Sequence, residues 1–222
     1  MGELHYQGKR LAEELPAEPG GGKGRRVETD SKGFWSSYGP LVIMAACIVL
    51  LLKVVFQLAF VPTASMEDTI PTNSLLISWQ LPYVIADPSP KHGDVVTFWS
   101  EEEDKLLVKR VIGLGGDEID ISGGYVYRND ELLEEPYLRE PGSTSAHSTS
   151  VYQVPEGHMF MMGDNRRNSL DSRLWKDPYA PVEAVNAKVL LCIPLKKAAG
   201  WVIGGRELTL YLPLLGQIHA IA

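Results

Sequence analysis

An apolar stretch from Pro40 to Phe60 is the feature that most constrains this chain. A helix needs about 20 apolar residues to cross a bilayer, and this stretch has that length. Its one charged residue, Lys53, is interpreted as a side chain that reaches the membrane surface, and a partner site inside the membrane is the alternative. A cleaved secretory signal is the competing interpretation of the stretch, but 39 residues precede it and its apolar run exceeds a typical signal core. We therefore predict an uncleaved transmembrane anchor over residues 38–60.

Basic residues are concentrated before this anchor. Lys23, Arg25, Arg26 and Lys32 lie within about 20 residues of it, whereas no Lys or Arg occurs from residue 61 until Lys91. Because cytosolic segments carry the excess of Lys and Arg, this asymmetry predicts a single-pass protein of the cell membrane with a cytosolic N-terminus. Everything after the anchor should then be extracytoplasmic.

The rest of the chain divides into a tail and one globular domain. Residues 1–37 combine charges with prolines and the run Gly20-Gly21-Gly22, a composition that cannot bury enough apolar area to fold. We predict a disordered cytosolic tail there. Residues 61–222 are long enough for one globular domain with a sizeable core. They contain 14 Lys and Arg against 22 Asp and Glu, which argues against a nucleic-acid partner.

Short apolar runs separated by Gly, Pro and Asp follow the anchor. Their lengths and their content of β-branched and aromatic residues are typical of strands, and no long helical pattern occurs among them. The segment Glu140–Ser150 is predicted to be a loop, and the apolar Leu208–Ala222 a strand or a membrane-surface segment. The expected fold is mainly β, with one transmembrane helix followed by an extracytoplasmic, antiparallel, barrel-like β domain. The predicted strands contain Leu75–Ile77, Val95–Trp99, Leu106–Ile112, Tyr125–Tyr127, His158–Met162 and Val189–Ile193.

The sequence suggests neither a cofactor nor a metal. Cys47 and Cys192 lie far apart, lack metal-ligand spacing and do not suggest a disulfide framework. The five histidines are scattered, and no metalloprotease helix motif occurs.

A serine and a lysine are the candidate catalytic pair. Ser65 lies five residues beyond the apolar stretch, and Lys109 lies within the apolar segment Leu107–Ile112. Strand alternation places Leu107 and Val111 on the same face as Lys109, so burial of that face would leave the ammonium without water. Such desolvation lowers a lysine pKa from about 10.4 towards 7–8, where lysine serves as a general base. The alternative is a surface strand with a solvated lysine beside an ordinary serine.

Four short motifs follow one another behind the anchor, at Pro62–Ile70, Gly93–Phe98, Lys109–Asp117 and Gly163–Arg173. In this order they resemble the four catalytic-domain boxes of bacterial type I signal peptidases, and the resemblance covers about residues 40 to 195. It implies a membrane-bound serine endopeptidase with Ser65 as nucleophile and Lys109 as base. Its partners would be the lipid bilayer and the signal peptides of exported preproteins, which such enzymes cleave after Ala-X-Ala-type sites.

The resemblance also implies roles for further residues. The Ser65 backbone N–H and the Thr63 hydroxyl would form the oxyanion hole. Ser169 would orient the lysine, and Asp171 and Arg173 would stiffen the site as an ion pair. An extended substrate would add to the sheet by backbone hydrogen bonds, with small side chains in shallow pockets. These pockets would be lined by Val61, Met66, Ile70, Leu107 and Val108, although each of these could equally belong to the core.

Two positions depart from the family pattern. Asp68 and Gly115 stand where many family members carry proline, and Asp68 puts a charge three residues from Ser65. Asp68 keeps open a membrane-tethered, non-catalytic β domain that binds extended peptides. A second alternative is a self-cleaving Ser/Lys peptidase of the regulator type, although such proteins carry a DNA-binding module and no anchor.

Overall fold

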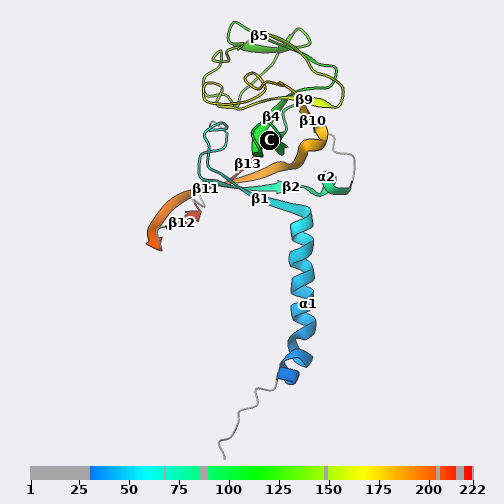
Figure 1. The fold of residues 1–222 in the computed structure, drawn as a ribbon, viewed down its shortest axis with the longest axis vertical. Coiled ribbons are helices and arrows are strands. Elements are labelled where there is room, and N and C mark those ends of the chain that lie inside the picture. The colour runs from blue at the N-terminus through cyan, green and yellow to red at the C-terminus, as the bar shows by residue number, and fades with distance from the viewer. Residues whose placement is uncertain are drawn as a thin grey trace, which may run out of the picture. The chain divides into compact units, whose positions relative to one another are not determined.

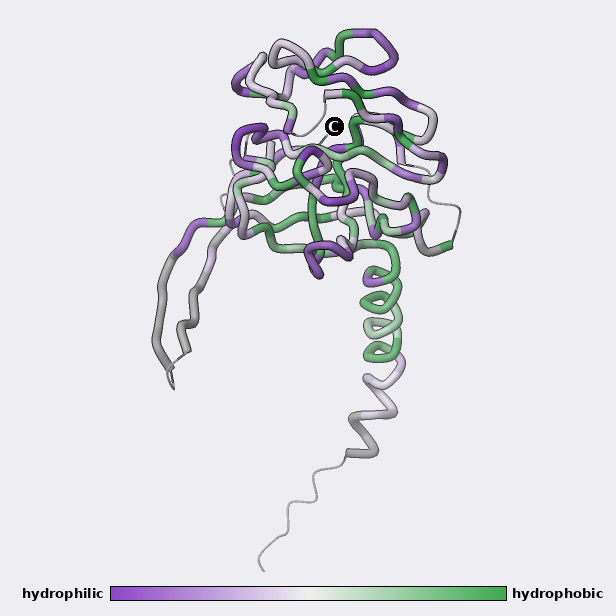
Figure 2. The backbone as a smooth tube through the Cα atoms, turned by 45° about the horizontal axis from the view of Figure 1, so that its top comes forward, coloured by the Kyte–Doolittle hydropathy of each residue, from purple (hydrophilic) through white to green (hydrophobic). Residues whose placement is uncertain are grey.

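The first element of the fold is a long apolar helix. The computed structural model describes residues 31–67, 69–85, 90–147, 150–203, 206–213 and 218–221, so most of the predicted tail lies outside it. Helix α1 spans Ser31–Val55, and its part Trp35–Val55 is long and apolar enough to cross a membrane. The hydrophobic character of its C-terminal turns is visible in Figure 2.

Strand β1 (Phe56–Val61) begins directly where α1 ends. The prediction of an anchor that continues to Phe60 is therefore wrong over its last five residues, 56–60. These residues pair with β2 (Ser74–Trp79) in a register that sets Phe56 opposite Trp79 and Val61 opposite Ser74. Pairing with β2 provides hydrogen-bond partners for the backbone N–H and C=O groups of this segment. The segment is therefore a strand, although it is as apolar as the helix before it.

The larger sheet has nine strands. Its path runs β1, β2, β11, β3, β4, β9 and β10, and all the neighbouring pairs are antiparallel, as predicted. Two further strands, β12 (Arg206–Pro213) and β13 (His219–Ala220), pair with β11, so part of the apolar C-terminal segment forms strands. The remaining strands of the path are β3 (Val95–Ser100), β4 (Lys105–Leu114), β9 (His158–Met162), β10 (Ala180–Pro181) and β11 (Val185–Ile203).

A second, four-stranded sheet has the order β7, β6, β5, β8. In Figure 1 it lies at the opposite end of the β domain from β1 and β2. All six apolar runs predicted as strands fall within strands of the two sheets. The strands of the second sheet are β5 (Glu118–Ser122), β6 (Tyr125–Arg128), β7 (Glu131–Leu132) and β8 (Val151–Gln153). The described residues also form a short helix, α2 (Leu81–Ile85), and a 3₁₀ turn, η1 (Val182–Ala184).

Strand β4 is fixed by two hydrophobic clusters. Val111 packs with residues of β3 and β9, including Phe98 and Met161. Its neighbour Ile112 points to the other face and packs with the smaller sheet. Because both faces of the strand are anchored in this way, the backbone that carries Lys109 has little freedom to move.

Candidate active site

Ser65 lies on a compact turn between β1 and β2. The turn is closed by backbone hydrogen bonds from Glu67 N to Ala64 O (3.0 Å) and from Thr69 N to Met66 O (2.8 Å). Met66 and Ile70 are fully buried in the cluster beneath β1 and β2. These two apolar side chains hold the turn against the core, so the half-buried Ser65 is presented at its outer side.

Lys109 shares one pocket with Ser65. The pocket has a volume of about 280 Å³ and is lined by both residues. Lys109 is only 2% exposed, and Leu107 and Val111 pack in the cluster on its strand face, as the alternation predicted. Among the described residues, its ammonium forms no ion pair and no hydrogen bond.

Burial lowers the pKa of Lys109 to about 8. Desolvation is the largest cause, and the positive charges of Lys105 and Arg173 act in the same direction. The carboxylates of Asp171 and Asp164 oppose them. A substantial fraction of this lysine is therefore neutral slightly above neutral pH, which a general base requires.

Three of the five predicted substrate-contacting residues, Val61, Leu107 and Val108, line this pocket. Met66 and Ile70 do not line it, because both are turned into the core. Thr63 is exposed and lines the pocket next to Ser65. The remaining lining residues are Phe60, Pro62, Ala64, Glu103, Lys105, Leu106, Asn168 and Leu170.

One edge of β4 is open beside this pocket. The strand pairs with β3 along Lys105–Arg110, but β9 pairs with it only from Arg110 onward. Along Lys105–Lys109, one edge of β4 therefore has no strand partner among the described residues. An extended peptide could pair with this edge.

The loop after β9 holds the turn that carries Ser65. The Asn165 backbone N–H donates to Ser65 O (3.0 Å), and its side-chain amide donates to Ala64 O (3.0 Å). The Asp164 N–H donates to the Met66 sulfur (3.5 Å), and the Thr69 hydroxyl donates to the Asp164 carboxylate. Segments about a hundred residues apart in the sequence are thus joined at the turn that carries Ser65.

Buried ion pairs support this loop. Arg110 donates to both oxygens of Asp164 (2.9 and 2.8 Å), and Arg173 does the same to Asp171 (both 2.8 Å). Burial by itself would raise the pKa of Asp171, but the hydrogen bonds and charge of Arg173, with a Gly163 N–H, hold this pKa below its usual value. Both aspartates are therefore held in place by buried arginines.

Ser169 lies close to the turn that carries Ser65. It is buried, and its hydroxyl forms no hydrogen bond of acceptable geometry with any described residue. It is still close enough to Asp171 to help lower the pKa of that carboxyl group. A Cβ atom on Gly163 would clash with both the Ser169 side chain and the Ser65 carbonyl oxygen. Ser169, Gly163 and Ser65 are thus brought together, and only a glycine fits between the two serines.

We expect Gly163→Ala to reduce activity at least tenfold and to destabilise the fold by about 1–3 kcal/mol, because the added methyl group must displace the Ser65 turn. Peptide cleavage and urea unfolding of the detergent-solubilised protein would measure the two effects. Gly39→Ala is the control, since its added methyl group meets only Trp35 at an ordinary 3.7 Å. Equal activities of the two variants would contradict this packing.

Asn165, Asp164 and Arg110 are contacts that sequence reasoning missed as site residues. All three lie within the four motifs, so the motifs could have indicated them, but only the fold shows that they support the turn that carries Ser65.

Of the two positions that depart from the family pattern, Asp68 lies outside the described residues. At Gly115 the backbone of Glu156 approaches so closely that a Cβ would lie 2.8 Å from its Cα, so this chain has a glycine where a side chain would not fit.

Comparison with known proteins identifies the family of this chain. The family model described as signal peptidase, peptidase S26, matches residues 35–193. The chain is 31% identical over 158 residues to a probable signal peptidase I-2 of Synechocystis, covering 68% of this chain and 70% of the relative. It is 34% identical over 146 residues to signal peptidase I U of Bacillus subtilis, covering 60% and 73%. A crystal structure of a signal peptidase I from Enterococcus faecalis matches at 28% identity with a TM-score of 0.40, over 45% of this chain and 96% of that one.

These matches show that the chain is a serine endopeptidase. Within this class, the chain belongs to the signal peptidase family, peptidase S26.

Proposed function

We propose that this protein is a signal peptidase I that cleaves exported preproteins with Ser65 and Lys109. One observation carries the proposal, namely that a serine and a buried lysine with a lowered pKa line the same pocket. The Ser65 hydroxyl attacks the scissile carbonyl while neutral Lys109 takes its proton. The resulting ammonium then gives the proton to the leaving amine as the peptide bond breaks. The acyl group is now held as an ester on Ser65. Lys109 takes a proton from water, the water oxygen attacks the ester carbonyl, and the ester bond breaks as Lys109 returns that proton to the Ser65 oxygen.

Thr63 and the Ser65 backbone N–H are the proposed oxyanion donors. Thr63 lines the pocket and is exposed, so its hydroxyl can meet a substrate oxygen. Loss of one such donor typically costs about 2.7–4 kcal/mol of transition-state stabilisation.

Ser169, Asp171 and Arg173 are the proposed supporting residues. Asp171 and Arg173 satisfy each other in a buried pair that fixes the loop next to the pocket. The Ser169 hydroxyl lacks a satisfactory partner of its own in the described part of the chain, which leaves it available to the lysine during the reaction.

The proposed substrate is an extended signal-peptide segment with small side chains next to the cleavage site. It would pair with the open edge of β4, with Val61, Leu107 and Val108 against its side chains. The pocket volume of about 280 Å³ lies near the lower limit of ligand pockets and suits alanine-sized groups. Incubation of the detergent-solubilised protein with a presecretory protein should yield a single cut after an Ala-X-Ala site. No cut, or cuts without this preference, would refute the proposal.

The pH dependence of cleavage tests Lys109 directly. The protonated lysine cannot accept the serine proton, so kcat/KM should rise with pH through an ionisation near 8 and then level off. Lys105→Gln removes one of the positive charges that lower the pKa of Lys109, so its ascending limb should shift to slightly higher pH. An ascending limb near 10.4, as for a free lysine, would exclude Lys109 as the base.

We further propose that α1 anchors the protein with its N-terminus in the cytosol and the β domain outside. Support comes from the length and composition of Trp35–Val55 and from the basic residues before it. Protease added to spheroplasts should digest the β domain and spare an epitope placed in the N-terminal tail. Detergent lysis, as the control, should expose both. Protection of the β domain with loss of the epitope would reverse the assignment.

A further inference from the structure

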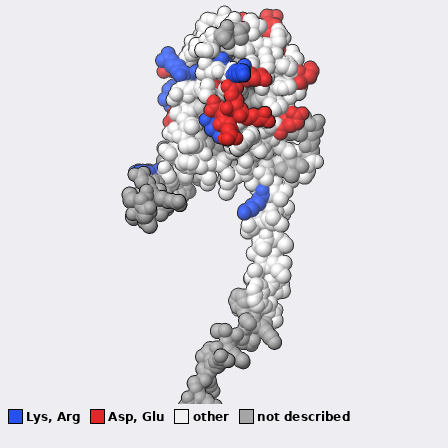
Figure 3. Space-filling model, in the orientation of Figure 1, with Lys and Arg blue, Asp and Glu red and all other residues white. Residues whose placement is uncertain are grey.

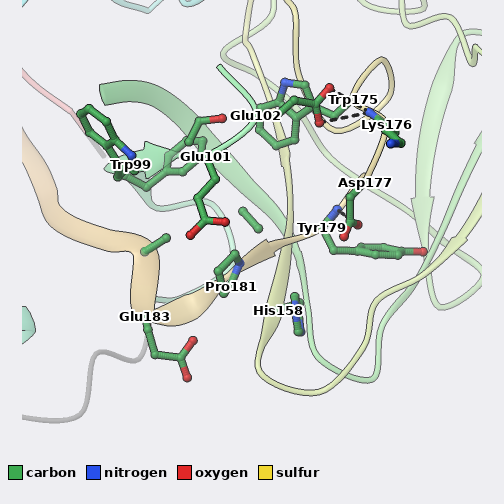
Figure 4. Close-up of a pocket in the computed structure, with 14 residues that line it drawn as sticks. Trp99, Glu101, Glu102, His158, Trp175, Lys176, Asp177, Tyr179, Pro181 and Glu183 are labelled. Atoms are coloured by element: carbon green, nitrogen blue, oxygen red, sulfur yellow. Dashed lines mark hydrogen bonds between the residues drawn. The ribbon is translucent and has the colours of Figure 1, made fainter. Parts of the chain in front are cut away.

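A second pocket shares no lining residue with the pocket that contains Ser65. It has a volume of about 790 Å³ and is formed by the end of β3, the turn after it, the loop before β10, and η1 (Figure 4). This volume is within the range of sites that bind ligands. Its residues have no part in the chemistry proposed above.

The pocket lies where the hydrogen bonding between two strands stops. β11 pairs with β3 from Val185, opposite Phe98, to Lys188, opposite Val96. Beyond Phe98, Trp99 and Ser100 continue β3 against β4 alone, and both line the pocket. The outer edge of this strand end therefore has no strand partner among the described residues, and η1 lies next to β3 there.

Aromatic and apolar side chains form the walls of this pocket. Trp175 is 8% exposed and packs edge-to-face on Phe98, with ring centroids 5.9 Å apart, so it is a fixed wall. Trp99 is 48% exposed, so it has surface available to contact a ligand. Tyr179, just before β10, lies on the opposite side of the pocket from Trp99, and Pro181 of β10 lies between them (Figure 4).

The rim carries four carboxylates against one ammonium. Lys176 supplies the ammonium, and its backbone N–H donates to both carboxylate oxygens of Glu102 (3.0 and 3.1 Å), which fixes that side chain. Glu101 and Glu183 form neither a hydrogen bond nor an ion pair within the ranges that the structure describes. Figure 3 shows Asp and Glu side chains gathered on the face over β4. The full set of charged residues is Glu101, Glu102, Asp177 and Glu183 with Lys176.

We propose that this pocket binds an extended polypeptide segment that carries Lys or Arg side chains. An ammonium or guanidinium group is attracted both by aromatic faces and by carboxylates, and this pocket presents both. The open end of β3 supplies backbone groups for the segment itself. A metal ion fits less well, because no group of three His, Cys, Asp or Glu among the described residues is close enough together to hold one.

A labelled peptide of alternating valine and lysine is the probe, with glutamate in place of lysine in its counterpart. Fluorescence anisotropy with the full chain in neutral detergent should show at least tenfold tighter binding of the basic peptide at low salt. The difference should shrink at about 0.5 M salt, where rim charges are screened. The basic peptide should leave cleavage of a neutral substrate unchanged. Equal affinity for the two peptides, or competition with the substrate at the Ser65 pocket, would overturn the proposal.

Two variants locate the binding site. Glu101→Gln combined with Glu183→Gln should weaken binding of the basic peptide at least about fivefold, and Trp99→Ala should weaken it at both salt concentrations. The matched control is Glu131→Gln combined with Glu134→Gln, which makes the same charge change at exposed positions that do not line the pocket. Substrate cleavage should be normal in all of them. Equal weakening in the control would mean that binding depends only on the net charge of the protein, and it would refute a specific binding site in this pocket.

Discussion

Ser65→Ala and Lys109→Met are each expected to lower signal-peptide cleavage by about 10³-fold or more, because each removes an indispensable part of one covalent step. Lys109→Arg should fail equally, since a guanidinium stays protonated and cannot act as a base. Cleavage of a presecretory protein by purified variants would measure the loss. Lys105→Met is the matched control, because it removes a lysine from the same pocket and leaves Ser65 and Lys109 in place; it should retain cleavage, with only the slight shift of the pH profile expected for Lys105→Gln.

A stability measurement separates this loss from misfolding. The pKa of Lys109 is about 8 in the folded protein and 10.5 in an unfolded chain, so the unfolded state binds more protons between these values. The burial of Lys109 therefore lowers the free energy of unfolding by its full amount below pH 8, and this destabilisation disappears as the pH rises through 10.5. Lys109→Met should therefore raise the midpoint of thermal unfolding at pH 7, with a smaller gain towards pH 10. An inactive but less stable variant at pH 7 would point to a structural role for the lysine.

The burial of Lys109 could be predicted because its signal is local, whereas its place beside Ser65 was expected only from the resemblance of the four motifs to the signal peptidase boxes. Leu107 and Val111 flank Lys109 at spacings of two, so a buried strand face necessarily carries the ammonium with it. The strands could be predicted for a similar reason, since their β-branched and aromatic runs end at turn-forming residues.

The boundary between helix and sheet could not be predicted from composition. The residues on either side of Val55 and Phe56 are equally apolar, and only the pairing with β2 decides that the helix stops there. Met66 and Ile70 were similarly ambiguous. They are four residues apart on a turn, and hydrophobicity alone does not tell a pocket wall from a core side chain; the turn directs both inward.

The partners of the charged residues were the least predictable part of the site. The chain has 21 basic and 28 acidic residues, and Arg110 meets Asp164 across 54 positions of sequence. Nothing local distinguishes that pairing from many others. Its position next to the Ser65 turn gives it a consequence for function as well as for folding.

Asp164→Ala is expected to destabilise the protein by about 3–5 kcal/mol, because it removes the carboxylate that pairs with a buried guanidinium. The side chains of Arg110 and Asp164 are 4% and 0% exposed, and Arg110 also donates to Gly93 O (2.8 Å) and the Thr69 hydroxyl (3.5 Å) and lies over the Tyr137 ring (3.8 Å). None of these three further contacts is with a negatively charged group. Asp164 also accepts from Thr69, so the turn that carries Ser65 should loosen and cleavage should fall as well.

Urea unfolding and cleavage by the same Asp164→Ala preparation would measure both effects. Glu140→Ala is the matched control, since the Arg167–Glu140 pair has the same chemistry at 71% and 56% exposure and should cost no more than about 1 kcal/mol. The double variant Arg110→Met with Asp164→Leu removes both charges, so it should be more stable than Asp164→Ala alone. If it is instead the less stable of the two, the cost lies in lost packing, and the uncompensated charge of Arg110 is not the reason that Asp164 matters.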